Sequence, residues 1–88
     1  MNTRTVAVID YGAGNLRSVR SALRHLGYEA MVVDSADAEI NARAMILPGV
    51  GAAADTMQNL TRSGLASLIK DWIAAGRPFL GICMGMQI

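Results

Sequence analysis

Cys83 is the only cysteine of the 88-residue chain, and it lies between two glycines in the segment Gly81-Ile82-Cys83-Met84-Gly85. The segment is the thiol form of the G-x-S-x-G pattern, in which a strand turns sharply into a helix and presents a nucleophile at the turn. Flanking side chains would collide there, and the glycines remove the collision. The start of a helix also favours the thiolate form of a cysteine. The segment therefore predicts that Cys83 is a nucleophile, although a free cysteine is more commonly a small buried hydrophobe.

A cysteine nucleophile needs a general base, normally a histidine oriented by an acidic residue. The chain has one histidine, His25. It lies well inside a predicted helix, which puts it roughly 15 Å from the edge that bears Cys83, at about 1.5 Å per helical residue. We therefore expect His25 to be a surface residue, and we expect the chain alone to have no useful activity. One cysteine cannot form an internal disulfide or a zinc site, so we expect no metal.

The composition is that of a small globular domain. Hydrophobic residues make up 52% of the chain and charged residues 17%, and no apolar stretch approaches the ~20 residues of a membrane span. A net charge of +1 argues against a surface for nucleic acid or anionic lipid, which needs clustered basic residues. The N-terminus runs into an apolar segment without the pattern of a secretory signal. We expect a cytoplasmic protein that binds neither membranes nor nucleic acid.

Apolar patterning predicts strands that alternate with helices. Short apolar runs, typical of strands buried on both faces, occupy residues 5–10, 28–34, 44–47 and 79–83. Helical spacing of apolar residues predicts a helix over residues 15–26, a shorter helical piece over 53–60, and a helix over 65–73 with Trp72 in the core. The alternation predicts an α/β fold, with a parallel sheet between helices on both faces.

Three glycine-bearing loops follow predicted strands, at residues 11–15, 48–51 and 83–87. Loops at the carboxyl ends of parallel strands line the functional crevice of such sheets, so we expect the three to converge at one edge. Gly12-Ala13-Gly14 could also begin a dinucleotide-binding fingerprint, with Asp34 as the acid that binds the ribose. Arg17 occupies the position of its third glycine, and we therefore expect no nucleotide cofactor.

The three loop segments together resemble the motifs of the class I glutamine amidotransferases. They are Asp10-Tyr11-Gly12-Ala13-Gly14-Asn15, Leu47-Pro48-Gly49-Val50-Gly51-Ala52 and Gly81-Ile82-Cys83-Met84-Gly85-Met86-Gln87. Within that family the segments are most similar to those of the glutaminase subunits of imidazole glycerol phosphate synthases. The resemblance implies a flavodoxin-like fold, of which residues 1–88 form the N-terminal part of a single domain, truncated after the fourth strand.

The same resemblance implies an activity and its residues. Cys83 would attack the side-chain amide of L-glutamine, releasing ammonia and then glutamate. The backbone N–H groups of Val50 and Met84 would form the oxyanion hole. The histidine and the acidic residue of the family's triad come after the point at which this sequence stops. The substrate-binding residues would be Gly49, Gly51 and Gln87.

The resemblance also implies a partner, a barrel-shaped cyclase subunit that receives the ammonia for imidazole glycerol phosphate formation in histidine biosynthesis. Residues of the first loop would lie near this interface and couple the subunits: Tyr11, Gly12 and Asn15. No cofactor is implied. A sheet that stops after four strands would expose an edge around Phe79, Leu80 and Met86, so we also expect copies of the chain to associate.

Two other functions remain open from the sequence. The ammonia acceptor could differ, as in pyridoxal phosphate synthesis, although the first two motifs favour the imidazole-forming branch. The chain could also be a non-catalytic interaction module with an unreactive Cys83. Arg17, Arg20 and Arg24 form a basic stripe along the first predicted helix, which we interpret as a solvated face rather than a partner contact.

Overall fold

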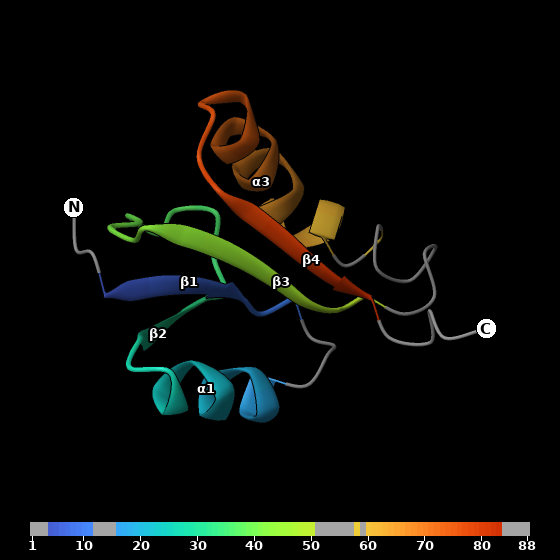
Figure 1. Ribbon diagram of the computed structural model, residues 1–88. Coiled ribbons are helices and arrows are strands. Elements are labelled where there is room, and N and C mark those ends of the chain that lie inside the picture. Colours follow the sequence, from blue (N-terminus) through green and yellow to red (C-terminus); the bar gives the residue numbers. More distant parts are fainter. Residues whose placement is uncertain (1–3, 12–15, 51–57, 59, 84–88) are drawn as a thin grey trace.

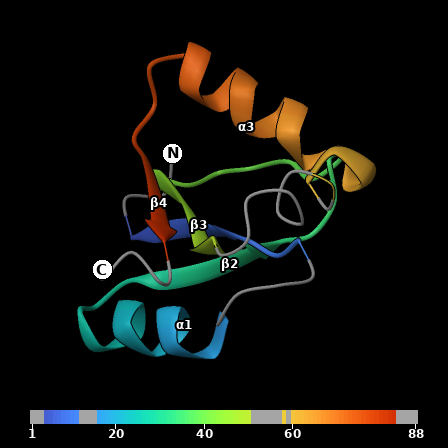
Figure 2. The ribbon, with the colours of Figure 1, turned by 90° about the vertical axis from the view of Figure 1, so that its right-hand side faces the viewer.

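The computed structural model describes residues 4–11, 16–50, 58 and 60–83 of the chain. The strands are β1 (Thr5–Ile9), β2 (Glu29–Val33), β3 (Ala44–Val50) and β4 (Phe79–Cys83), and the helices are α1 (Leu16–His25) and α3 (Leu65–Ala74). The four strands are parallel and form one sheet in the order β2-β1-β3-β4. Figures 1 and 2 show α1 on one face of this sheet and α3 on the other. The predicted α/β architecture is confirmed.

β1 is the central strand, and all five of its residues are buried. Successive side chains point to opposite faces of a sheet, so this short strand contributes to two cores. Val6 and Val8 pack with Leu23 on the face that α1 covers. On the opposite face, Ala7 and Ile9 belong to the larger cluster that includes residues of α3. Burial on both faces explains why β1 is almost continuously apolar.

α1 ends at His25, close to its predicted end. Gly27 follows with φ 90°, a left-handed conformation that glycine adopts without steric cost. The N–H of Tyr28 then donates to the carbonyl oxygen of Leu23 at 2.8 Å, which closes the last turn. Leu26 continues the helical spacing of Leu16, Val19 and Leu23, which predicts a buried position, but it is 68% exposed, so this prediction is wrong. The helix ends before Leu26, and the chain then turns back into the sheet as β2.

α3 follows the predicted stripe closely. Leu65, Ile69 and Trp72 are buried at spacings of four and three residues, and the core position predicted for Trp72 is confirmed by its 5% exposure. Of the shorter helical piece predicted over 53–60, residues 58 and 60 are helical, and the helix continues through residue 63. The remainder of that piece lies outside the described residues.

β3 is longer than predicted. The sequence analysis places a loop over residues 48–51, but β3 extends through Pro48 to Val50, so the prediction is wrong for these three residues. Proline lacks an N–H group and is therefore tolerated in a strand mainly at edges and bulges. Such an irregularity is present here, because the pairing of β3 with β4 shifts register between Leu47 and Val50. No helix among the described residues is both long enough and apolar enough to cross a membrane.

Candidate active site at the carboxyl edge of the sheet

Cys83 is the last residue of β4, and its backbone pairs with that of Val50, the last residue of β3. Before this point the pairing is regular and ends with Leu47 opposite Gly81. From there to the next pair β3 advances by three residues (50 − 47) and β4 by two (83 − 81). One extra residue in β3 is the signature of a β-bulge, a device that redirects a strand next to active sites. The bulge sets the backbone of Val50 beside that of Cys83.

Tyr11 supports this bulge from β1. Its hydroxyl donates a hydrogen bond to the carbonyl oxygen of Pro48 at 2.8 Å, in a buried setting. Tyr11 is 5% exposed and packs in the cluster on the α3 face together with Leu47 and Leu60. Pro48 is itself fully buried. An aromatic side chain two residues after the end of β1 therefore holds the residue at which β3 departs from regular pairing.

The described residues bring part of the predicted site together. Cys83, Val50 and Gly49 lie at the carboxyl ends of two neighbouring strands. Tyr11 contacts the end of β3 through its hydrogen bond to Pro48. The other predicted site residues lie outside the described part of the chain: Gly12, Asn15, Gly51, Met84 and Gln87. The roles given to all of these residues, including the interface role of Tyr11, stay predictions.

His25 lies at the opposite edge of the sheet. It is the last residue of α1, and the turn that follows it is joined to the residue before β1. There the Arg4 side chain donates to the Gly27 carbonyl oxygen at 3.1 Å, and the N–H of Glu29 donates to the Arg4 carbonyl oxygen at 2.7 Å. The five residues of β1 separate the two edges by roughly 16 Å, at about 3.3 Å per residue. Its exposed position at this edge keeps His25 away from Cys83.

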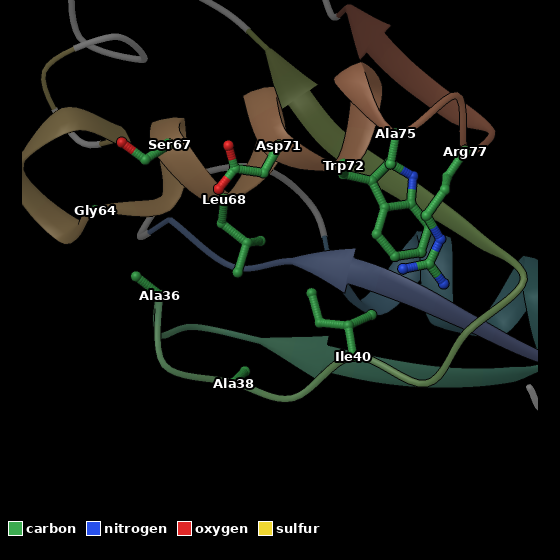
Figure 3. Close-up of a pocket in the computed structure, with 10 residues that line it drawn as sticks. All are labelled: Ala36, Ala38, Ile40, Gly64, Ser67, Leu68, Asp71, Trp72, Ala75 and Arg77. Atoms are coloured by element: carbon green, nitrogen blue, oxygen red, sulfur yellow. The ribbon is translucent and has the colours of Figure 1, made fainter.

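Of three hollows in the described part of the chain, two lie away from β3 and β4. One, of about 350 Å³, lies between α3 and the segment that joins β2 to β3. Figure 3 shows Leu68 and Ile40 pointing toward each other across it, with the Arg77 side chain beside Trp72. The other, of about 650 Å³, lies between α1 and β2, and exposed Arg17, Arg20 and Arg24 line it. Neither hollow includes a residue of β3 or β4.

Within the part of the chain that the structure describes, no group of three or more His, Cys, Asp or Glu residues could hold a metal ion. Among the residues at the carboxyl ends of β3 and β4, Cys83 is the one with a nucleophilic group. A thiol beside preorganised N–H donors suits acyl transfer, because the donors stabilise the oxyanion of a tetrahedral intermediate.

Comparison with known proteins bears directly on this site. The family model of the class I glutamine amidotransferases matches residues 7–88. The chain belongs to the class I glutamine amidotransferase family. The match includes the ends of β1, β3 and β4, and the resemblance predicted from the three glycine-bearing segments is confirmed.

Several relatives of this amidotransferase chain carry the same name. The imidazole glycerol phosphate synthase subunit HisH of Symbiobacterium thermophilum is 53% identical over 83 residues, which are 94% of this chain and 39% of the relative. The subunit HisH of Mycobacterium bovis is 46% identical over 88 residues, which are 100% of this chain and 43% of the relative. The chloroplastic imidazole glycerol phosphate synthase hisHF of Arabidopsis thaliana is 49% identical, with 94% of this chain covering 14% of the relative. The chain thus spans about two fifths of the HisH relatives that it matches.

Sequence reasoning placed Cys83 and the segment around Val50 at one edge of the sheet, and the structure agrees, but it missed the hydrogen bond between Tyr11 and Pro48. The two residues are 37 positions apart, and helical or strand periodicity carries no signal of such a contact. The sequence offered one sign, a large aromatic residue that stands directly before a glycine and two positions after a buried strand.

Proposed function

We propose that this chain is the nucleophile-bearing N-terminal part of a glutaminase domain, which hydrolyses L-glutamine and passes the ammonia to a cyclase partner for imidazole glycerol phosphate formation. The observation that carries the proposal is the pairing of Cys83 with Val50 at a bulge on the carboxyl edge of the sheet. Membership of the amidotransferase family and the names of the relatives support it. In this proposal the protein acts in the cytoplasm, in a heterodimer with a barrel-shaped cyclase subunit of histidine biosynthesis.

In the first half of the reaction, the Cys83 thiolate forms a bond to the amide carbon of the glutamine side chain. The carbonyl oxygen becomes an oxyanion, which the N–H groups of Val50 and Met84 stabilise. Collapse of this intermediate breaks the carbon–nitrogen bond. The nitrogen takes up a proton and leaves as ammonia, and a thioester remains on Cys83.

In the second half, water attacks the thioester, the carbon–sulfur bond breaks, and glutamate and the free thiol are released. Both halves need a base that moves protons at the cysteine and at the water. The only histidine of the chain, His25, lies at the other edge of the sheet. We therefore propose that the base and its acidic partner are supplied from outside residues 1–88, and that these residues alone do not turn over glutamine.

The exposed strand edges support a further proposal, that copies of the chain associate. β2 and β4 lie at the two sides of the described sheet, and Leu80 of β4 is 57% exposed. A strand edge with apolar side chains is a template for pairing with another strand.

A glutamine-mimicking electrophile tests the proposed activity. We would join residues 1–88 to the C-terminal remainder of the Symbiobacterium thermophilum HisH subunit, supply its cyclase partner, and treat the complex with 6-diazo-5-oxo-L-norleucine. We expect a single covalent label on Cys83 by peptide mass spectrometry, and ammonia release from glutamine that Cys83→Ala lowers by about 10³-fold or more.

The Cys83→Ala variant should keep its thermal midpoint and its binding to the cyclase partner, which separates lost chemistry from lost folding. A folded complex that neither releases ammonia nor reacts at Cys83 would favour the non-catalytic interaction module. Normal ammonia release without coupling to the cyclase would point to a different acceptor.

A further inference from the structure

We propose that Tyr11 is a positioning residue for the oxyanion site: by holding the Pro48 carbonyl, it fixes the peptide segment that leads to Val50, the residue paired with Cys83, whose N–H the proposed function assigns to the oxyanion hole. The inference rests on the proposed glutaminase activity. It gives Tyr11 a task inside its own subunit, in addition to the interface role that the family resemblance implies.

The position of Tyr11 in the sheet is the first step of the argument. Backbone pairing between β1 and β3 joins Val6–Val8 to Ala44–Ile46 and, within the described residues, extends no further. Beyond Ile46, β3 continues for four more residues to Val50. The Tyr11 side chain spans this stretch and bonds to Pro48 at 2.8 Å. It therefore links the segment that follows β1 to β3, beyond the last backbone pair.

The chemistry of Pro48 is the second step. Proline has no N–H group, so its carbonyl oxygen is the only backbone group with which it can form a hydrogen bond. That carbonyl lies in one rigid plane with the N–H of Gly49. Because the bond from Tyr11 is buried, it is formed away from water, where hydrogen bonds are electrostatically stronger. Fixing the carbonyl therefore fixes the orientation of the whole Pro48–Gly49 peptide.

The flexibility of Gly49 is the third step, because it explains why the Pro48–Gly49 peptide needs to be fixed. The N–H of Val50 belongs to the next peptide plane, and only the two backbone dihedrals of Gly49 separate the planes. Glycine adopts both signs of φ readily, so the Val50 peptide could rotate unless it were held from both sides. Pairing with Cys83 holds one side, and the Tyr11 bond to Pro48 holds the other.

Tyr11→Phe is the direct test, because it removes the hydroxyl and leaves the buried ring. In the hybrid HisH subunit with its cyclase partner, we expect kcat for glutamine to fall about tenfold, less than the loss on deleting an oxyanion donor. We expect KM to stay within about twofold, since an interaction made mainly in the transition state lowers kcat alone. Alkylation of Cys83 by iodoacetamide should keep its rate, because that reaction forms no oxyanion.

A merely structural role gives a different result. General loosening of the site would raise KM and change the alkylation rate together with kcat. Trp72→Phe is the matched control, because the Trp72 ring N–H also donates to a proline carbonyl, that of Pro78, at 2.8 Å. This bond lies at the amino edge of the sheet, where the strands begin. The control substitution should lower the thermal midpoint at least as much as Tyr11→Phe and leave kcat within about twofold, as expected for a residue remote from the chemistry.

A measurement without turnover separates this inference from the proposed function. Amide hydrogen exchange of the 88-residue chain should show faster exchange at Gly49 and Val50 in Tyr11→Phe, by about tenfold for the loss of one buried hydrogen bond. The amides of β1 and β2 should be unchanged. Unaltered exchange at both residues, or an unaltered kcat in an active complex, would overturn the role of Tyr11. A parent complex without ammonia release would contradict the glutaminase proposal instead.

Discussion

The two edges of the sheet use the same kind of bond for different purposes. At the amino edge, Trp72 donates to the carbonyl of Pro78, just before β4. At the carboxyl edge, Tyr11 donates to the carbonyl of Pro48, inside β3. In both cases a buried aromatic side chain donates a hydrogen bond to the carbonyl oxygen of a proline. Proline has no backbone N–H group, so it cannot donate a backbone hydrogen bond of its own. The surroundings of the two bonds differ, and this difference indicates how the fold separates stability from chemistry.

The amino edge is tied together by several elements. The Arg77 guanidinium lies 3.5 Å from the centre of the Trp72 ring and donates to the Ala42 carbonyl oxygen at 3.0 Å. Pro78 accepts a second bond, from the N–H of Met45 at 3.1 Å. These contacts join α3, β4 and the residues before β3, where strand pairing is regular. At the carboxyl edge the pairing shifts register instead. We infer that the amino edge stabilises the sheet and that the bulged edge serves the proposed glutaminase reaction.

The largest effect at the amino edge is expected from Trp72→Ala. The substitution removes a buried indole, its hydrogen bond and the surface on which Arg77 lies, so the free energy of unfolding should fall by about 3–5 kcal/mol. Urea denaturation of the 88-residue chain measures the loss. Ile73→Ala, at a half-exposed neighbour on the same helix, is the control and should cost about 1 kcal/mol or less. Equal losses for the two variants would contradict the special role of Trp72.

A smaller effect is expected from Arg77→Met, which keeps an apolar stem but removes the guanidinium. Loss of the stacking on Trp72 and of the bond to Ala42 should lower the free energy of unfolding by about 1–2 kcal/mol. Arg62→Met, at an exposed helical position, should change it by no more than about 0.5 kcal/mol. In the hybrid HisH subunit, kcat should be unaffected by Arg77→Met. A lower kcat would mean that the two edges are coupled more closely than the contacts indicate.

The smallest change in stability is expected from Leu80→Glu, which places a charge on the exposed part of β4. We expect the free energy of unfolding to change by about 0.5 kcal/mol or less, while dimers or larger species, measured by light scattering at high concentration, give way to monomers. Ile73→Glu adds the same charge on α3 and should leave association unchanged. A parent chain that is monomeric at high concentration would remove the basis for proposing self-association.

Much of the fold could be predicted because the relevant signals are local. The apolar run of β1 reflects its burial on both faces, and the spacing of Leu65, Ile69 and Trp72 reflects one buried helix face. The end of β3 could not be predicted in the same way, because Pro48 normally argues against a strand. The strand persists there through a bulge and through a bond from Tyr11, a residue 37 positions away. Leu26 fits the helical stripe, but the chain turns at Gly27 before Leu26 can pack.

The candidate site was predictable for a different reason. Its glycine-bearing segments are recognisable as residue types in a fixed order, even though periodicity says little about loops. The sequence could predict that the segments around Cys83 and Val50 meet at one edge of the sheet, but it placed Val50 in a loop and could not show that an extra residue in β3 sets the two residues opposite each other. Registers of this kind depend on contacts between distant strands, such as the one that Tyr11 provides.

The strand order has one consequence for how this architecture can vary. The chain moves from β1 to β2 on one side and then crosses back to add β3 and β4 on the other, so the direction of winding reverses between β1 and β3. Such a reversal opens the gap in which α/β proteins bind their ligands, and Tyr11 and Pro48 meet across it. Strands could therefore be added beyond β2 or β4 while β1, β3 and the groups at this gap keep their places, but β4 could not be lost, because it carries Cys83.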